Sequence, residues 1–425
     1  MLLEFTVRNF LSIKDEVTLS MIASKDDFRL EDNTMIYEKD KVPNRALNVA
    51  TLYGANASGK TNILKAMSFA SFFINKSHEM QQGKIIPRIP FKLDRSYLKE
   101  PSEFRIVFIY EEIKYVYMFS VMEQEVMEEY LYYYPKGRQS IIFERVRDEY
   151  KFTNDIELQR ELKNKFHSKN KLFLSTESLW EYEKAKKPFK WLSEYFNVFI
   201  DHENLEAYTG ESMVENNKIN EDVKKYMKYA DMDIDDINVK VKKKDDILSS
   251  EIFKIISDDT KSDIINHIDD DSKFLDIKTI HKGIDEKGNP LNISFDLSDE
   301  SDGTQKYFGI LGPLIKVLRN GYTVIIDELD IRLHTLLVMK LVELFSNPNI
   351  NKNKAQLIFS THDTNLLDRN ILRRDQIWFT EKKEDKSTDL YSLYEFGGVR
   401  KNDKIEKGYL QGKYGAIPFF KGDLI

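Results

Sequence analysis

The segment Gly54-Ala-Asn-Ala-Ser-Gly-Lys-Thr61 is the most informative part of this 425-residue chain. It fits the pattern G-x-x-x-x-G-K-[ST] of a phosphate-binding loop, or P-loop. Residues 46–53 before it form a mostly apolar run typical of a buried strand, and residues 62–70 after it continue with helical spacing. Phosphate binding requires a strand, a glycine turn and a helix, because N–H groups of the loop and helix N-terminus surround the phosphates. The segment therefore predicts a nucleoside triphosphate site.

Each position of this loop has an expected role. Lys60 should reach the β- and γ-phosphates, and the Thr61 hydroxyl should bind Mg²⁺. The alternative is a chance glycine-rich turn, against which the flanking strand and helix argue. We therefore expect ATP to be held by Gly54, Asn56, Ala57, Ser58, Gly59, Lys60, Thr61 and Asn62.

The composition is that of a globular protein with a small acidic excess. The chain has 64 basic and 71 acidic residues, a formal charge of −7 and 41% apolar residues. This charge argues against a surface built throughout for nucleic acid, but it leaves a local basic groove open. The chain has no cysteine, which excludes disulfides and thiol catalysis. There is no apolar run of about 18 residues and no signal-peptide pattern, so we predict a cytoplasmic protein without a membrane span.

Three regions are expected along the chain. Residues 1–153 should form an N-terminal lobe with several antiparallel strands around the P-loop. Residues 154–290 are rich in Lys, Glu and Asp, and they should form an inserted, mainly helical region that docks a partner or substrate. Residues 291–425 resume the nucleotide-binding pattern. The predicted fold class is therefore α/β, a P-loop core with a mixed sheet and an insertion.

Strand pairs are predicted at three places. Residues 104–110 and 114–121 are rich in aromatic and β-branched residues and should form a hairpin. Residues 130–134 and 140–145 should form a second pair. A third hairpin is expected near 274–297, turning at a Gly-Asn-Pro sequence.

Two further strands end in residues suited to ATP hydrolysis. An apolar strand at 322–326 is followed by Asp327 and Glu328, the Walker B arrangement of a P-loop protein. Asp327 would hold Mg²⁺, and Glu328 would polarise a water molecule beside the γ-phosphate. Another apolar strand at 355–360 precedes His362, which could hydrogen-bond a γ-phosphate. Taken alone, two acids at a strand end or a lone histidine would more often be structural.

A small, hydroxyl-bearing segment lies upstream of the two acids. Ser301, Gly303, Thr304 and Gln305 precede a helical run from 307 to 318. This creates a second helix N-terminus suited to an anion.

The order of these motifs resembles the ABC-type ATPase head found in SMC and RecF-like proteins. The resemblance covers residues 1–75 and 295–380. It implies that Ser301, Gly303, Thr304 and Gln305 match the signature motif and that His362 matches the switch histidine. The signature reads S-D-G-T-Q rather than the transporter L-S-G-G-Q, and no clear Q-loop glutamine is present. The chain is also similar to the stand-alone AAA-type ATPases of abortive-infection and anti-phage systems, related to the ATPase half of OLD nucleases.

The resemblance implies a homodimer or higher homo-oligomer in which the heads enclose ATP. Ser301 and Gly303 of one copy would complete the P-loop site of the other, with Lys60, Glu328 and His362 as catalytic residues. Such ATPases usually control a separately encoded effector, often a nuclease. The stretch after His362 is short, so no nuclease domain is expected in this chain.

Two other functions stay open at this stage. A RecF-like DNA-repair ATPase would need a nucleic-acid surface, and two basic stretches interleaved with aromatics, 160–171 and 184–191, are its candidates. A solvated helix face is the favoured interpretation of both. A scaffold that only assembles around nucleotide is the third hypothesis, and Glu328 argues against it.

Overall fold

The computed structural model describes residues 1–26, 28–38, 44–200, 204–230, 232–243, 273–399 and 403–418. The chain divides into two compact units. Unit 1 comprises Met1–Asp201, Val317–Ile331 and Val338–Ile425, and unit 2 comprises His202–Lys316 and Arg332–Leu337. None of the helices in the described part of the chain is both long and apolar enough to cross a membrane.

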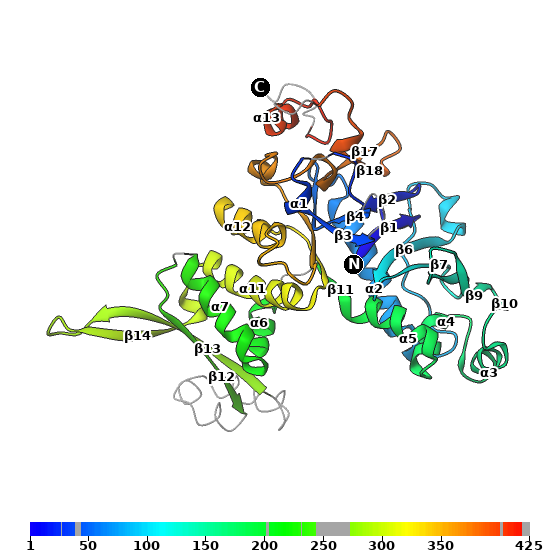
Figure 1. Ribbon diagram of the computed structural model, residues 1–425, viewed down its shortest axis with the longest axis horizontal. Helices are drawn as coiled ribbons and strands as arrows, with labels where there is room; N and C mark the ends of the chain where they lie inside the picture. Colours follow the sequence, from blue (N-terminus) through cyan, green and yellow to red (C-terminus); the bar gives the residue numbers. More distant parts are fainter. Residues whose placement is uncertain are drawn as a thin grey trace. The chain divides into compact units, whose positions relative to one another are not determined.

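The central sheet of unit 1 has six strands in the order β11-β15-β16-β5-β17-β18 (Figure 1). All neighbours pair in parallel except β17 and β18. Every residue of β5 and β16 is buried, as expected for parallel strands covered on both faces. The strands are β5 (Val49–Tyr53), β11 (Phe196–Phe199), β15 (Thr323–Ile326), β16 (Gln356–Ser360), β17 (Ile377–Lys382) and β18 (Thr388–Ser392).

A second, antiparallel sheet of unit 1 has the order β10-β9-β8-β7-β6-β1-β2. Helix α2 (Lys60–Lys76) packs against it, with Phe69 on Phe104 and Phe73 on Phe119. The predicted strand pairs of this lobe are confirmed as β6–β7 and β8–β9. The strands are β1 (Leu2–Arg8), β2 (Val17–Ser20), β6 (Ser102–Tyr110), β7 (Ile113–Val121), β8 (Val126–Tyr134), β9 (Ser140–Val146) and β10 (Glu149–Phe152).

The described part of the region from 154 to 290 contains helices, strand β11 of the central sheet and a small separate sheet. Strands β12, β13 and β14 form a three-stranded antiparallel sheet. The pairing of β13 with β14 confirms the hairpin predicted near 274–297. Contacts within the chain assign residues up to 201 to the unit that holds the P-loop. The two compact units therefore do not coincide with the three predicted regions. The predicted boundaries of those regions stay a prediction. Residues 244–272 of the predicted insertion lie outside the described residues. The elements are α3 (Ile156–Phe166), α4 (Phe173–Leu179), α5 (Glu183–Lys190), α6 (Leu205–Glu215), α7 (Asn217–Tyr229), β12 (Asp236–Lys243), β13 (Lys273–Ile284) and β14 (Pro290–Asp296).

The mixed α/β class, with a P-loop core and antiparallel strands, is thus confirmed. The remaining helices and strands are α1 (Leu30–Asn33), β3 (Thr34–Glu38), β4 (Asn44–Leu47), α11 (Asp302–Asn320), α12 (Thr335–Ser346) and α13 (Ile405–Leu410).

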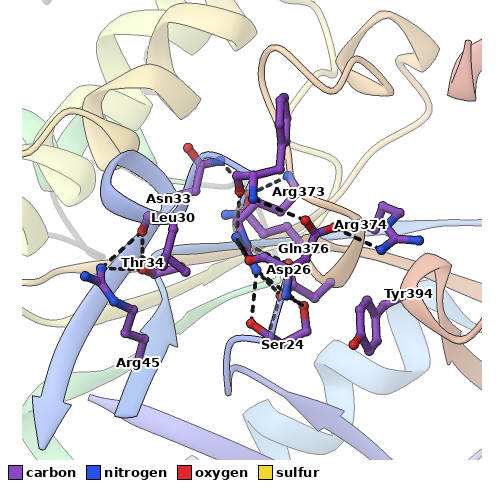
Figure 2. A network of polar contacts seen from close by, with 12 residues as sticks. Ser24, Asp26, Leu30, Asn33, Thr34, Arg45, Arg373, Arg374, Gln376 and Tyr394 are labelled. Carbon is purple, nitrogen blue, oxygen red and sulfur yellow. Dashed lines mark hydrogen bonds and ion pairs between the residues drawn. The ribbon is translucent and has the colours of Figure 1, made fainter. Parts of the chain in front are cut away.

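A buried polar network in unit 1 ties the segment after β2 to the start of β17 (Figure 2). The buried Arg373 guanidinium donates to Asp375 and to the carbonyl oxygen of Asp26, at 2.7 and 2.8 Å. Arg374 pairs with the Asp26 carboxylate at 3.0 Å and lies over the Tyr394 ring. Burial acts to raise the pKa of Asp26, but the Phe28 N–H and Arg374 hold it below its ordinary value. The network positions β17, which pairs with the P-loop strand β5.

A second buried cluster joins α4 to the antiparallel sheet. Glu129 on β8 accepts hydrogen bonds from the Phe173 and Leu174 N–H groups at 2.7 and 3.0 Å, and Arg145 lies 3.5 Å away. Glu177 on the same helix is fully buried, and neither carboxylate oxygen has a hydrogen-bond partner among the described residues. Burial, together with the charge on Glu129, raises the pKa of Glu177 well above its ordinary value. Burial therefore favours the protonated form of Glu177.

Replacing Glu177 with glutamine should make the protein more stable than the wild type, by an amount that grows as the pH rises. Because the pKa of Glu177 is raised in the folded protein, its contribution to the free energy of unfolding is fully present below the unfolded-state pKa of about 4.3. This contribution is lost as the pH rises through the folded-state pKa. Glutamine does not titrate, so the variant should gain on the wild type by about 1.4 kcal/mol per pH unit across that interval. Urea unfolding at about pH 5 and about pH 8 measures this difference. The exposed Glu157→Gln is the control, and a wild-type slope in Glu177→Gln would contradict the assignment.

Candidate ATP-binding site

The topology brings three predicted motifs to one edge of the central sheet. Strand β5 ends at Tyr53 before the P-loop, β15 ends before Asp327, and β16 ends before Thr361 and His362. β16 lies between the other two strands and is parallel to both. The carboxyl ends of parallel strands meet at one edge, where ligands of α/β sheets bind. The P-loop and the acids of Walker B therefore face a common region.

The P-loop adopts a conformation that only glycine permits at its end. Gly59 has φ +119°, and a Cβ added there would lie 2.2 Å from Thr388 Oγ1. Helix α2 begins at the next residue, so its first-turn N–H groups, including those of Lys60 and Thr61, have no carbonyl partner within the helix. The loop therefore presents backbone donors to an anion.

Lys60 is buried over this loop. Its Nζ donates to the Gly54 carbonyl oxygen at 2.7 Å. Burial lowers the pKa of Lys60, while the carboxylates of Asp327, Glu328 and Asp330 act to raise it. The ammonium thus lies within the electrostatic reach of all three acids, as the predicted role beside the phosphates requires.

Side chains of strands β17 and β18 form hydrogen bonds with the P-loop, a contact that the sequence analysis did not predict. Thr380 Oγ1 hydrogen-bonds Ser58 Oγ at 2.6 Å, and Thr388 Oγ1 donates to the Ser58 carbonyl at 3.0 Å. Thr388 Oγ1 also bonds Ser12 Oγ at 2.7 Å, and Ser12 accepts a hydrogen bond from the Asn62 side chain at 2.6 Å. Asn62 therefore anchors the helix to the N-terminal segment, and its predicted contact with ATP stays a prediction.

Ser360 organises the two Walker B acids. Its hydroxyl hydrogen-bonds Asp327 Oδ1 and accepts from the Glu328 N–H, the latter at 2.8 Å. Glu328 has φ +46°, a left-handed conformation uncommon outside glycine, and such strain concentrates at functional sites. Asp327 is buried, whereas Glu328 is half-buried. The arrangement fixes the direction in which each carboxylate leaves the strand end.

Asp330 is an additional acid of the site that the sequence analysis did not select. Its Oδ2 accepts a hydrogen bond from the exposed His362 N–H at 3.1 Å. Its buried Oδ1 has no hydrogen-bond partner among the described residues. The D-E-x-D spacing was the signal that could have identified it. Asp330 links the strand end that carries Glu328 to the one that carries His362.

These residues fit Mg²⁺ bound together with a nucleotide. The unpartnered Asp330 oxygen and the neighbouring Asp327 leave excess negative charge at a site where a triphosphate adds more. Carboxylate and hydroxyl oxygens are the ligands that Mg²⁺ prefers, usually with phosphates and water completing the shell. Thr61 and Asp327 stay the predicted ligands.

The predicted signature residues belong to unit 2, whereas the P-loop belongs to unit 1. Ser301 is exposed and precedes α11, and its Oγ accepts from the Thr304 N–H at 3.2 Å. Gln305 Nε2 donates to the Glu300 carbonyl at 2.8 Å. A Cβ at Gly303 would lie 2.9 Å from the Arg332 carbonyl oxygen, so this helix start is closely packed. The exposed start of α11 is available to a ligand or partner.

The basic stretches considered for nucleic acid are partly neutralised by ion pairs. Trp191 is fully buried and stacks on Phe108 with ring centroids 4.2 Å apart, so it is not exposed for contact with a nucleic-acid strand. Neighbouring lysines form ion pairs with acids: Lys165–Glu161, Lys184–Asp155, Lys186–Glu183 and Lys187–Glu111. This favours the solvated helix face over a nucleic-acid grip.

The chain resembles known proteins in two of the comparisons made. Among solved structures, an SMC head bound to the C-winged helix domain of ScpA is 12% identical, covers 92% of this chain and 97% of that chain, and has a TM-score of 0.44. The SMC head domain from Thermotoga maritima is 11% identical, covers 92% and 98%, and has a TM-score of 0.41. No curated protein matches. A family model described as "AAA domain, putative AbiEii toxin, Type IV TA system" matches residues 49–368, from the P-loop strand to beyond His362. The chain therefore belongs to this family of AAA domains.

Proposed function

We propose that the protein is a Mg²⁺-dependent ATPase that dimerises around ATP and controls a separately encoded effector in anti-phage defence. The observation that carries this proposal is the position of Lys60, Asp327 and Glu328 beyond the carboxyl ends of β5 and β15, the two parallel strands on either side of β16. The family description, which names putative toxins of type IV toxin–antitoxin systems, supports the defence role.

The residues of the site divide the work of hydrolysis. Lys60 and the first-turn N–H groups of α2 bind the phosphates and neutralise their charge. Bound Mg²⁺ would be held by Thr61 and Asp327 and would stabilise charge on the phosphates. Glu328 orients the attacking water and accepts its proton, and His362 hydrogen-bonds the γ-phosphate. Ser360 maintains the geometry of both acids through its hydroxyl.

The signature residues complete the site in trans. An exposed serine hydroxyl and a helix N-terminus suit a γ-phosphate, and Ser301 at the start of α11 offers both. Two such sites shared between two copies make ATP the bridge that holds the heads together. Hydrolysis then removes the bridge, so the dimer is a two-state element biased by ATP. A conformational signal of this kind suits the control of an effector.

Mixing two inactive variants tests the shared site. Lys60→Ala destroys the P-loop, and Gly303→Asp places a carboxylate at the signature; each homodimer should be inactive. A mixed dimer contains one intact P-loop facing one intact signature, so the mixture should regain up to about a quarter of wild-type ATPase activity, from half the dimers having one working site. Lys60→Ala mixed with Glu328→Gln is not expected to recover, because the only site with an intact P-loop then lacks its base. Failure of the first mixture to exceed its separate components would contradict a site shared in trans.

A further inference from the structure

The small sheet of unit 2 has two edges with opposite character. One edge strand, β12, carries Lys240, Lys242 and Lys243. Lysines on an edge strand discourage other strands from pairing with it. The other edge strand, β14, has no charged residue from Leu291 to Phe295. Between its terminal Pro290 and Asp296, β14 therefore lacks this protection.

The β14 edge also exposes a row of apolar side chains. Leu291, Ile293 and Phe295 alternate along the strand and so share one face, and they are 42%, 37% and 41% exposed. Ile293 packs over Gly283 of β13, since a Cβ added at Gly283 would lie 2.3 Å from Ile293 Cδ1. The hairpin β13–β14 extends past α6 and α7 (Figure 1). The row is thus an ordered, uncovered apolar surface.

At the other end of the β13–β14 hairpin, helix α6 packs on the same face of the sheet. There, Leu275 and Ile277 of β13 lie against Gly210 of α6, at distances near 3 Å from the position of a Cβ at that glycine. Both residues lie on the same face of β13 as Gly283, because they are separated from it by even numbers of positions. Helix α6 therefore partly covers one end of the face, whereas the β14 end is more exposed.

The backbone of β14 presents a matching set of hydrogen-bonding groups. The Asp285 N–H donates to the Asn289 carbonyl, which makes their pair hydrogen-bonded. Antiparallel pairs alternate, and the register of β13 and β14 continues without a shift, so Leu291, Ile293 and Phe295 bond toward β13. Asn292 and Ser294 consequently direct their N–H and C=O groups to the free edge.

We propose that β14 pairs antiparallel with β14 of a second copy of this chain, with Ile293 opposite Ile293 at the two-fold axis. This register places Leu291 opposite Phe295 and Asn292 opposite Ser294, so apolar side chains meet apolar ones and polar meet polar. Each Asn292–Ser294 pair exchanges two backbone hydrogen bonds, and no charged side chain in 291–295 meets a like charge. An antiparallel pair of identical strands satisfies two-fold symmetry without further adjustment. The sequence of β14 is thus complementary to itself.

This contact is distinct from the ATP-dependent pairing of heads proposed above. One strand pair and three side chains per copy bury far less than the roughly 1,200 Å² of a stable complex, so the contact alone should be weak. Linked to a second interface, it would act at high effective concentration and strengthen the assembly. It therefore supplies a nucleotide-independent site of self-association.

A single introduced cysteine tests the register, because the natural chain has none. Ile293→Cys places two thiols opposite each other in a non-hydrogen-bonded pair, where the Cα atoms are about 4.5 Å apart, within disulfide range. Oxidised glutathione then accepts the two electrons as the thiols become a disulfide. In a Lys60→Ala background without nucleotide, the cross-linked dimer should form at least about ten times faster than in Ile284→Cys, which lies on the same hairpin outside the pair. Equal rates in the two variants would overturn the proposal.

A charge at the same position tests the association itself. Ile293→Lys places two ammonium groups opposite each other, so sedimentation equilibrium at about 100 µM protein should show a lower mean mass than wild type. Ile284→Lys is the control, at a position on β13 that is 73% exposed, and it should keep the wild-type mass. A wild type that is monomeric under these conditions, or an unchanged mass in Ile293→Lys, would also overturn the proposal. Because nucleotide is absent, neither result bears on the ATPase.

Discussion

Replacing Glu328 with glutamine is expected to slow ATP hydrolysis by about 10²–10⁴-fold while ATP binding is retained, because loss of a general base costs this much. The amide has the shape of the carboxylate but cannot accept a proton from water. The backbone conformation at Glu328, with its N–H held by Ser360, does not depend on the side-chain charge. The variant should therefore keep the geometry of the site and lose only the proton transfer.

Three measurements follow this variant. Phosphate release under saturating ATP gives the rate, and light scattering with ATP and Mg²⁺ should show a persistent dimer, since the bound ATP is no longer consumed. In a phage-challenge assay with the neighbouring genes present, the same variant should lose protection if cycling is needed to control the effector. Glu343→Gln, an exposed acid on α12, is the control and should behave as wild type. Hydrolysis at the wild-type rate in Glu328→Gln would show that another group is the base.

Replacing Lys60 with alanine is expected to weaken ATP binding by about 10²-fold or more. The ammonium is buried close to three carboxylates, and it is the group that offsets their repulsion of the phosphates. A hydrogen bond to a charged group contributes about 1.5–3 kcal/mol, and loss of charge compensation adds to this. Hydrolysis should consequently fall below detection at ordinary ATP concentrations.

Calorimetric titration with a non-hydrolysable ATP analogue and Mg²⁺ measures this loss directly. Lys65→Ala is the matched control, because Lys65 lies on the same helix and is exposed. The thermal midpoint without nucleotide separates a binding defect from unfolding, and it should change little in either variant. Wild-type affinity in Lys60→Ala would exclude this lysine as a phosphate ligand.

Local patterns were sufficient for the predicted hairpins and the P-loop. The β6–β7 hairpin shows why: its register pairs Tyr110 with Ile113, and the two turn residues, Glu111 and Glu112, have φ of 49° and 64°. Alternating apolar residues on each side of a short polar turn encode such a structure within one continuous segment. The P-loop is equally local, because its donors belong to one turn and the first turn of one helix.

Local sequence patterns did not predict which side chains are buried. Trp191, which sits among lysines in the sequence, is fully buried, and Glu177 is a buried carboxyl within a helical segment. Whether a residue in such a mixed segment faces the core depends on which other element packs on it. The same is true of the β14 edge, which is an edge because β14 is the last strand of its sheet among the described residues.

The sequence by itself determined the P-loop, the order of the acidic and histidine motifs and the α/β class, because each rests on neighbours along the chain. Only the tertiary structure decided that β16 separates the P-loop strand from the Walker B strand, and that Thr380 and Thr388 brace the loop. Ser58 and Thr380 are 322 positions apart, and Ser12 and Thr388 are 376 apart. Contacts over such separations follow from packing the whole core, which no local periodicity records.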